Sequence, residues 1–280
     1  MVVIENVDIN LNDTLTCGQI FRYTKEDDNS YTVITADRVI NIKQDKDKIL
    51  VKSSKEKDLE KFIRHYLDLD RDYITLNKLL IDSDNSLEEI INKCNGFKIM
   101  NQPKFETIIS YILSSNNRVP QIAKALNNIS ERYGDKIIFE GKEYYLFPTQ
   151  KQLSKCNVDD LRKLKTGFRD KYIYEFVNKV NKKEIDLDKI DTMSSEDAMK
   201  YLMNNKGIGE KVASCILLFG YSRLDVFPID TWVKKYMNDE YGIKKVEDIR
   251  KFTKDKYGGY SGLAIQYMFH YKRNKEEIMS

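Results

Sequence analysis

The chain has 280 residues, of which 41% are hydrophobic and 32% charged, and this balance excludes a collagenous, low-complexity or wholly disordered protein. The 47 basic and 44 acidic residues leave a net charge of +3, too small for a general attraction to nucleic acid, so any such surface must be local. No segment approaches the roughly 18 uninterrupted apolar residues of a membrane helix, and no basic leader precedes an apolar run at the start. We therefore expect a cytoplasmic protein with about two domains, and we take a monomer as the default.

The cysteines and histidines set further limits on the chemistry. Four cysteines lie too far apart for a disulfide framework or for paired CxxC metal-binding elements, so we expect free thiols: Cys17, Cys94, Cys156 and Cys215. Only two histidines are present, His65 and His270, which leaves little material for histidine-centred catalysis or a zinc site.

Short runs of β-branched and aromatic residues in the first fifty or so residues predict a twisted antiparallel sheet. The runs are 31–35, 38–42 and 49–52, and polar turn segments separate them. From Ser54 onward the apolar residues follow helical spacing. The expected fold class is therefore α+β, with an N-terminal antiparallel β-sheet domain and flanking helices at 1–96, followed by a mostly α-helical domain at 97–280.

Start and stop signals mark several helices in the second half. One begins after Pro103, a residue that suits a first helical turn, and another ends at Gly134. Two more have a capping side chain followed three residues later by a reciprocal partner: Thr149 with Gln152, and Ser194 with Asp197.

Two glycines separate the pair of helices predicted at about 195–220. Gly207 fits a position just past a helix end, where positive φ costs least, and Gly209 allows close approach of a backbone to the next helix's N-terminus. The unpaired N–H groups and positive dipole of that end suit a phosphate. Because ordinary helical bundles also connect in this way, both interpretations stand at this point.

Two charged residues follow this glycine turn. Lys211 lies in the first turn of the second helix, where the dipole disfavours a cation; the same field, together with desolvation in a cleft, would favour the neutral amine of a nucleophile. Asp230 precedes another helical run and suits an N-cap. A capped carboxylate stays ionised and rigidly aimed, as a stabiliser of developing positive charge must be. The capping and catalytic interpretations are therefore compatible.

Five segments together carry a family resemblance. The run 202–233, LMNNKGIGEKVASCILLFGYSRLDVFPIDTWV, resembles the helix-hairpin-helix motif and the catalytic loop, here 221–232, of the DNA glycosylase superfamily. Four more resemble the 8-oxoguanine DNA glycosylase/AP lyase family: LNDTLTCGQIFRY, FETIISYILSSNNR, LRKLKTGFRDKYI and GLAIQYMF. The segments occur in family order over nearly the whole chain.

The resemblance implies a bifunctional base-excision repair enzyme associated with the nucleoid. Its partner would be duplex DNA containing 8-oxoguanine, and no cofactor would be required. Lys211 would attack C1′ of the damaged nucleoside and form a Schiff base, while Asp230 stabilises the oxocarbenium-like charge. Because the C2′ proton of that adduct is acidic, β-elimination would then nick the strand.

The flipped base would occupy a pocket. Cys215 lies four residues after Lys211 and so shares its helix face. By resemblance, Cys215 and Phe269 sandwich the purine, and the Gly18 carbonyl accepts the N7 hydrogen that 8-oxoguanine has and guanine lacks. From the residues alone, Gly18 also suits a turn and Phe269 the core of an amphipathic helix.

Three more residues match the family's contacts to the opened duplex. Asn116 matches the residue that fills the gap left by the base, Phe168 the aromatic wedge, and Arg169 a contact to the orphaned cytosine. Without the resemblance they suit a helix end, a core aromatic and a surface arginine. Gly207 and Gly209 would bring hairpin amides to the DNA backbone.

The chain departs from the family at three positions, and at one of them Trp232 stands where some relatives have a histidine that contacts phosphate. Gln121 replaces an arginine that also contacts the cytosine, so preference for cytosine opposite the lesion is expected to relax. The glutamine that recognises the purine's Watson–Crick edge falls at Ile265. Gln266 comes one place late, about 100° around a helix, and is expected to point elsewhere.

The superfamily's hairpin often binds a monovalent cation through backbone carbonyls, which here would belong to Met203, Asn205 and Ile208. Its iron–sulfur branch has four clustered cysteines after the catalytic helix, and no cysteine follows Cys215, so we expect no cluster. Two alternatives stay open: a glycosylase for another damaged purine, and a non-catalytic helix-hairpin-helix DNA-binding protein. Lys211 with Asp230 argues against the second, because binding alone needs neither.

Overall fold

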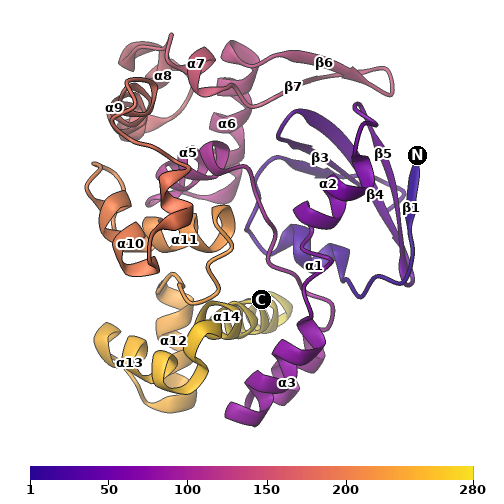
Figure 1. The fold of residues 1–280 in the computed structure, drawn as a ribbon, viewed down its shortest axis with the longest axis vertical. Helices are drawn as coiled ribbons and strands as arrows, with labels where there is room; N and C mark the ends of the chain where they lie inside the picture. Colours follow the sequence, from indigo (N-terminus) through magenta and orange to yellow (C-terminus); the bar gives the residue numbers. More distant parts are fainter. Residues whose placement is uncertain (280) are drawn as a thin grey trace.

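The computed structural model describes the backbone of residues 1–279 and the side chains of residues 1–273. A five-stranded antiparallel sheet with strand order β1-β5-β4-β3-β2 forms the N-terminal part, at the right of Figure 1. Its strands are β1 Val2–Ile4, β2 Tyr23–Lys25, β3 Tyr31–Thr35, β4 Arg38–Asp45 and β5 Lys48–Ser53. The predicted antiparallel sheet and the α+β fold class are confirmed.

One face of the sheet forms a small hydrophobic core. Cross-strand neighbours such as Val33 with Ile40, and Ile42 with Val51, are buried there. Helix α2 (Leu59–Tyr66) adds Ile63 to the same core. Alternating residues of a strand point to opposite faces, so these pairs place one face of the sheet inward.

A short helix, α1 (Leu11–Thr16), interrupts the region that was expected to be strands throughout. The Asn10 side chain accepts a hydrogen bond from the Asp13 backbone N–H at 3.0 Å and so caps this helix. Six residues are too few to display a helical period, which is why the sequence pattern did not reveal it. This helix leads directly into the segment around Gly18.

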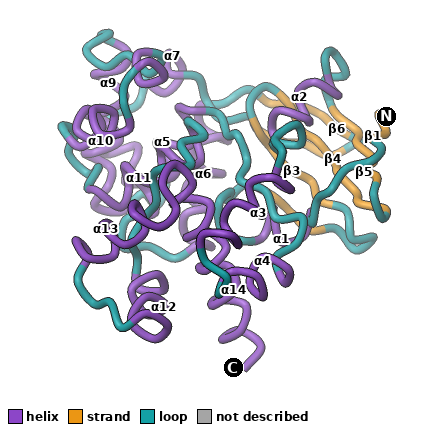
Figure 2. Tube along the Cα trace, turned by 60° about the horizontal axis from the view of Figure 1, so that its bottom comes forward, coloured by secondary structure: helices purple, strands orange, loops and turns teal. Residues whose placement is uncertain are grey.

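The rest of the described chain is mainly helical (Figure 2). Its helices are α3 Tyr73–Ser83, α4 Leu87–Lys93, α5 Lys104–Ser114, α6 Val119–Tyr133, α7 Gln150–Leu153, α8 Val158–Lys163, α9 Asp170–Asn181, α10 Ser195–Met203, α11 Glu210–Gly220, α12 Thr231–Tyr241, α13 Val246–Tyr257 and α14 Ser261–Met279. A second, larger core lies among them. No helix in the part of the chain that the structure describes is both long and apolar enough to cross a bilayer.

Several local predictions in this region are confirmed. Helix α5 begins after Pro103, and α6 ends at Gly134. Thr149 and Gln152 form a complete capping box, whereas Ser194 caps α10 by accepting a hydrogen bond from the Asp197 backbone N–H at 3.1 Å. The structure also contains a hairpin that was not predicted, β6 (Lys136–Phe139) with β7 (Lys142–Tyr145). Figure 1 shows it extending from the helices toward the sheet.

Part of the chain before residue 96 belongs to the larger, helical core. Helices α3 and α4 bury Leu76, Leu80 and Ile90 in the larger, helical core, and α4 packs against α14 near the other end of the chain. The division at 96 and 97 stays a prediction. The consequence for the site is that the segments flanking Gly18 and helix α14 are joined to one hydrophobic core.

Candidate active site

A cavity of about 190 Å³ lies where the segment after α1 meets α5, α11, α12 and α14. It is the place where the N-terminal segment and the helical part of the chain come together. Its walls include Lys211 and Asp230, together with three residues of the predicted pocket, Gly18, Cys215 and Phe269. The complete lining is Cys17, Gly18, Gln19, Phe21, Tyr111, Ser114, Asn117, Val119, Ile122, Lys211, Cys215, Phe219, Pro228, Asp230, Val233, Gln266, Phe269 and Arg273.

Lys211 and Asp230 meet this cavity from two helix N-termini. Lys211 is exposed in the first turn of α11, and no described residue forms a hydrogen bond or ion pair with its ammonium group. Asp230 is the N-cap of α12, and its Oδ1 accepts a hydrogen bond from the Val233 backbone N–H at 2.9 Å. The capping predicted for Asp230 is confirmed. The cap fixes the carboxylate at the rim of the cavity that Lys211 lines.

Cys215 and Phe269 supply apolar surface to the same cavity. Burial raises the pKa of the Cys215 thiol to about 12, although the charge of Lys211 opposes that rise. The sulfur is therefore neutral and polarizable at physiological pH, which suits contact with an aromatic ring. Phe269 is only half-buried, on α14. The structure brings both to the cavity, and their contact with a base stays a prediction.

The backbone carbonyls of Cys17, Gly18 and Gln19 differ in whether a described residue donates a hydrogen bond to them. Gly18 has a φ of +93°, a conformation that favours glycine. Arg273 Nη1 donates to the Cys17 carbonyl at 3.0 Å, and Gln102 Nε2 donates to the Gln19 carbonyl at 2.8 Å. No described residue donates to the Gly18 carbonyl. The Cys17 and Gln19 carbonyls thus accept hydrogen bonds, whereas the Gly18 carbonyl between them has no donor among the described residues.

The Gln19 side chain anchors this segment in the interior. Its Nε2 donates to the carbonyls of Thr14 and Lys98, at 2.7 and 3.0 Å, and its Oε1 accepts from the Met100 backbone N–H at 2.9 Å. Its amide is buried, so all three hydrogen bonds are shielded from water. The segment that contains Gly18 is therefore rigid before any ligand binds.

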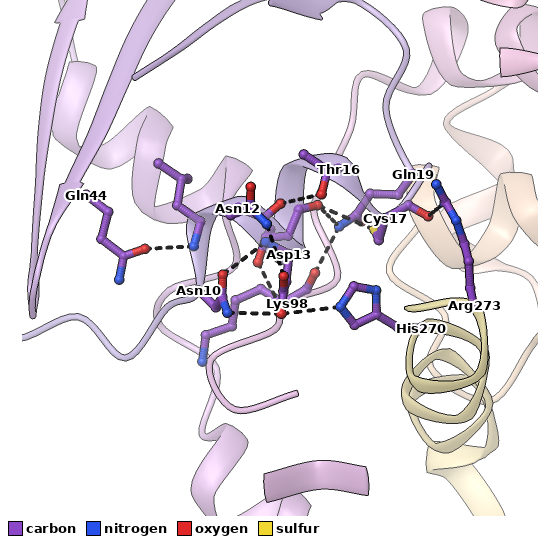
Figure 3. A network of polar contacts seen from close by, with 12 residues as sticks. Asn10, Asn12, Asp13, Thr16, Cys17, Gln19, Gln44, Lys98, His270 and Arg273 are labelled. Carbon is purple, nitrogen blue, oxygen red and sulfur yellow. Dashed lines mark hydrogen bonds and ion pairs between the residues drawn. The ribbon is translucent and has the colours of Figure 1, made fainter. Parts of the chain in front are cut away.

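Helix α14 holds the N-terminal segment at a second point. His270 Nε2 lies 3.3 Å from Asp13 Oδ2, and the imidazole stacks on Phe97 with ring centroids 5.2 Å apart. The hydrogen bond from His270 lowers the pKa of Asp13. Figure 3 shows His270 facing Asp13 and Arg273 reaching the Cys17 carbonyl from the same helix. Together these contacts fix α14 against the segment that includes Gly18.

The expectations for Ile265 and Gln266 are wrong. Ile265 has 0% of its surface exposed and packs in the helical core, whereas Gln266 lines the cavity. Gln266, Phe269 and Arg273 are spaced by three and then four residues, so they lie along one helix face. The register of α14 therefore presents an amide to the cavity, one place later than the family alignment assigns it.

The residues expected to enter the duplex lie outside the cavity. Asn116 is exposed just after α5 with a φ of +50°, and Phe168 is 57% exposed before α9. Arg169, in contrast, is 6% exposed, and its guanidinium donates to the backbone carbonyls of Ser115 and Asn116. Gln121 is exposed in the first turn of α6. Their contacts with DNA stay predictions.

The glycine turn between α10 and α11 has the predicted backbone. Gly207 has a φ of +83°, and a Cβ there would lie 2.6 Å from the Tyr172 ring. Gly209 is the N-cap of α11, and a Cβ there would meet no atom within 4 Å. That open space leaves the first N–H groups of α11 accessible, as the predicted phosphate contact requires.

The carbonyls proposed for a cation lie on the same turn. The Asn205 carbonyl accepts a hydrogen bond from the Ile208 backbone N–H at 3.1 Å, which leaves one of its lone pairs. Only backbone oxygens would bind such a cation, and its presence stays a prediction for Met203, Asn205 and Ile208. Within residues 1–273, no group of three or more His, Cys, Asp or Glu side chains could hold a metal ion. All four cysteines are free thiols.

Comparisons with known proteins match two successive parts of the chain to two family models. Residues 1–108 match the model of the 8-oxoguanine DNA glycosylase N-terminal domain, and residues 109–256 match that of the HhH-GPD superfamily base excision DNA repair proteins. A curated relative is the probable N-glycosylase/DNA lyase of Methanothermobacter thermautotrophicus. It is 27% identical over 240 residues, which are 78% of this chain and 76% of that protein.

Two solved structures resemble nearly the whole chain. The structure of MBOgg1 with a low affinity DNA ligand is 36% identical, with a TM-score of 0.93 over 98% of this chain and 96% of that one. The Clostridium acetobutylicum 8-oxoguanine glycosylase/lyase, bound to double-stranded DNA with cytosine opposite 8-oxoguanine, is 34% identical. Its TM-score is 0.93 over 98% of this chain and 95% of that one.

Proposed function

Because the chain belongs to the 8-oxoguanine DNA glycosylase family of the HhH-GPD base excision repair superfamily, we propose that it removes 8-oxoguanine from duplex DNA and then cuts the strand. The observation that carries this proposal is the convergence of Lys211 and Asp230, from two helix N-termini, on a cavity with an unoccupied Gly18 carbonyl. The enzyme is a bifunctional glycosylase and lyase, like the curated relatives of that name.

The proposed reaction begins at Lys211. Its neutral amine attacks C1′ of the flipped nucleoside as the N-glycosidic bond breaks, and the departing base takes up a proton. Opening of the sugar ring leaves a Schiff base between Nζ and C1′. Loss of the C2′ proton then breaks the C3′–O bond and cuts the strand, and hydrolysis of the imine returns the lysine.

Asp230 is proposed to stabilise the positive charge that the sugar gains as the base departs. Its hydrogen bond from the Val233 N–H keeps the carboxylate at a fixed angle to the cavity. A preoriented charge of this kind needs no reorganisation when the reaction occurs.

Selection of the damaged base is proposed to depend on the Gly18 carbonyl. Since the neighbouring carbonyls of Cys17 and Gln19 already accept hydrogen bonds, this acceptor is the one left for the N7 hydrogen of 8-oxoguanine. Cys215 and Phe269 would contact the two faces of the ring. Gln266 is the polar side chain on α14 that can bond the remaining edge of the base.

Opening of the duplex is proposed to use Asn116 in the gap left by the base and Phe168 as a wedge in the stack. Both side chains are exposed, as that role requires. Gln121 has no charge with which to contact the opposite cytosine, so we propose that excision depends only weakly on the opposite base.

Excision assays on duplexes with a single 8-oxoguanine test the proposed function. We expect Lys211→Gln to bind the lesion duplex but to lose more than about a thousandfold in cutting rate, since no covalent adduct can form. Lys200→Gln is the matched control, because Lys200 is an exposed lysine of α10 that forms an ion pair with Glu196. Full cutting by Lys211→Gln would refute the mechanism, and wild-type cutting of undamaged guanine would refute the substrate.

A further inference from the structure

Two turns with left-handed backbone are joined by hydrogen bonds, and the cavity-lining residues Ser114 and Asn117 flank the first of them. The first follows α5 and contains Asn116, with a φ of +50°; the second precedes α9 and contains Gly167, with a φ of +62°. Each turn carries one of the exposed side chains that are proposed to enter the duplex, Asn116 and Phe168. They are separated by 51 intervening residues (117–167), so an explicit contact must hold them in a common geometry.

Arg169 provides that contact. Its Nε donates to the Ser115 carbonyl at 2.9 Å, and its Nη2 donates to the same carbonyl and to that of Asn116, the latter at 2.8 Å. Its Nη1 lies 3.5 Å from the Thr166 carbonyl of its own turn. One guanidinium therefore bonds to both turns.

The same guanidinium also lies against the wedge. Its central carbon is 4.3 Å from the centroid of the Phe168 ring, within the range of a cation–π contact. No carboxylate among the described side chains pairs with Arg169, so backbone carbonyls and this ring are its partners. At 6% exposure it has little surface left for a further ligand.

The chemistry requires arginine. A guanidinium presents five N–H donors in one rigid plane, so it can bond two adjacent carbonyls while its face contacts an aromatic ring. A lysine ammonium is a compact charge on a flexible stem, and it cannot hold the same partners at fixed angles.

We propose that Arg169 is a positioning residue that joins Asn116 and Phe168 into one rigid unit for opening the stack. This inference rests on the proposed function of Asn116 and Phe168.

The test compares substrates that do and do not need an opened stack. Single-turnover cutting is measured for wild type, Arg169→Gln and Arg169→Lys on duplexes with 8-oxoguanine opposite each of the four bases. A single-stranded oligonucleotide with one abasic site serves as the substrate that has no stack to open. Arg132→Gln is the control for loss of a positive charge, because Arg132 is an exposed arginine of α6 that also lies over an aromatic ring, that of Tyr133.

We expect Arg169→Gln to slow all four duplexes by one common factor, on the order of tenfold, as the loss of buried hydrogen bonds to a charged group implies. Arg169→Lys should recover part of that loss on every duplex. Both variants should cut the abasic single strand within about twofold of wild type, which shows that they are folded and that Lys211 is intact.

Three results would overturn the inference. A loss confined to the duplex with cytosine would make Arg169 a contact to the opposite base. An equal loss on the abasic single strand would place the defect in the fold or the chemistry, and wild-type rates on every duplex would leave Arg169 without a role. Asn116→Ala and Phe168→Ala, measured in parallel, report on the proposed function alone, because their full activity would refute the entry of these side chains whatever Arg169 does.

Discussion

Gly18 illustrates how much of the proposed selectivity depends on one backbone position. Its φ of +93° turns its carbonyl away from the internal hydrogen bonds that its neighbours make. A Cβ at this position would lie 3.4 Å from Arg273 Nη1, so the space around it is adequate. The constraint is the backbone conformation, which L-residues adopt at a cost of about 1–2 kcal/mol.

We therefore expect Gly18→Ala to lose discrimination between 8-oxoguanine and guanine by about tenfold, because relief of the strain would turn the carbonyl. Its lyase activity on an abasic duplex should stay within about twofold of wild type. Gly242→Ala is a matched control, since Gly242 also has positive φ, +68°, but caps α12 away from the cavity. Unchanged discrimination in Gly18→Ala would argue against the carbonyl as the selective acceptor.

In helix α14, the proposed recognition of the base depends on which residues the helix turns toward the cavity. The rotation of α14 about its axis decides whether Ile265 or Gln266 faces the cavity. In the structure Gln266 lines the cavity and Ile265 packs in the core. The family motif assigns the base contact to position 265. Residues three or four places before Phe269 share its helix face, so spacing alone allows either Ile265 or Gln266. Packing of Ile265 in the core decides between them.

Paired substitutions on α14 test this assignment. Gln266→Ala should slow excision by about tenfold with little change in stability, because it removes a polar contact to the base. Ile265→Gln should lower the free energy of unfolding by about 2 kcal/mol, since it buries an amide without a partner. Excision assays and denaturant unfolding measure the two effects. Faster excision by Ile265→Gln would show that position 265, not 266, contacts the base.

Helices α1 and α14 are joined by Asp13 and His270, and this contact predicts a pH dependence. The hydrogen bond from His270 holds the pKa of Asp13 below its ordinary value of 3.8. A carboxyl with a depressed folded-state pKa contributes stability above its unfolded pKa, and that contribution disappears as the pH falls through the folded value.

Asp13→Asn should therefore be less stable than wild type at pH 7, and the difference should shrink below about pH 4. Thermal unfolding across pH 3–7 measures it. Asp239→Asn is a useful comparison, because Asp239 also pairs with a cation of α14, Lys272, but away from the cavity. A difference in stability that grows as the pH falls would contradict the assigned role of the Asp13 carboxylate.

At the scale of the whole molecule, local patterns predicted the elements better than they predicted contacts between elements. The strands 31–35 and the helices around Gly207 and Gly209 follow from periodicity and turn chemistry, and Asp230 was recognisable as a cap. The hairpin β6–β7 and helix α1 were missed, because runs of four to six residues are too short to show a period.

In the site, too, local patterns predicted some residues but not the contacts between distant segments. Lys211, Asp230 and Cys215 could be assigned to one cavity from spacing and family resemblance, because they lie within 20 residues of one another. The hydrogen bonds of Arg169 and Arg273 could not be predicted, since each guanidinium bonds to a carbonyl of a distant segment. No local pattern contains such a contact, and only tertiary packing creates it.

Borohydride trapping tests the central claim most directly. The protein is incubated with duplexes that contain one 8-oxoguanine, or undamaged guanine as control, and any covalent adduct is digested and its attachment residue identified by mass spectrometry. We predict an adduct with the lesion duplex only, attached at Lys211 and absent from Lys211→Gln. Attachment at another residue, or tight binding of the lesion duplex with no adduct, would contradict the mechanism.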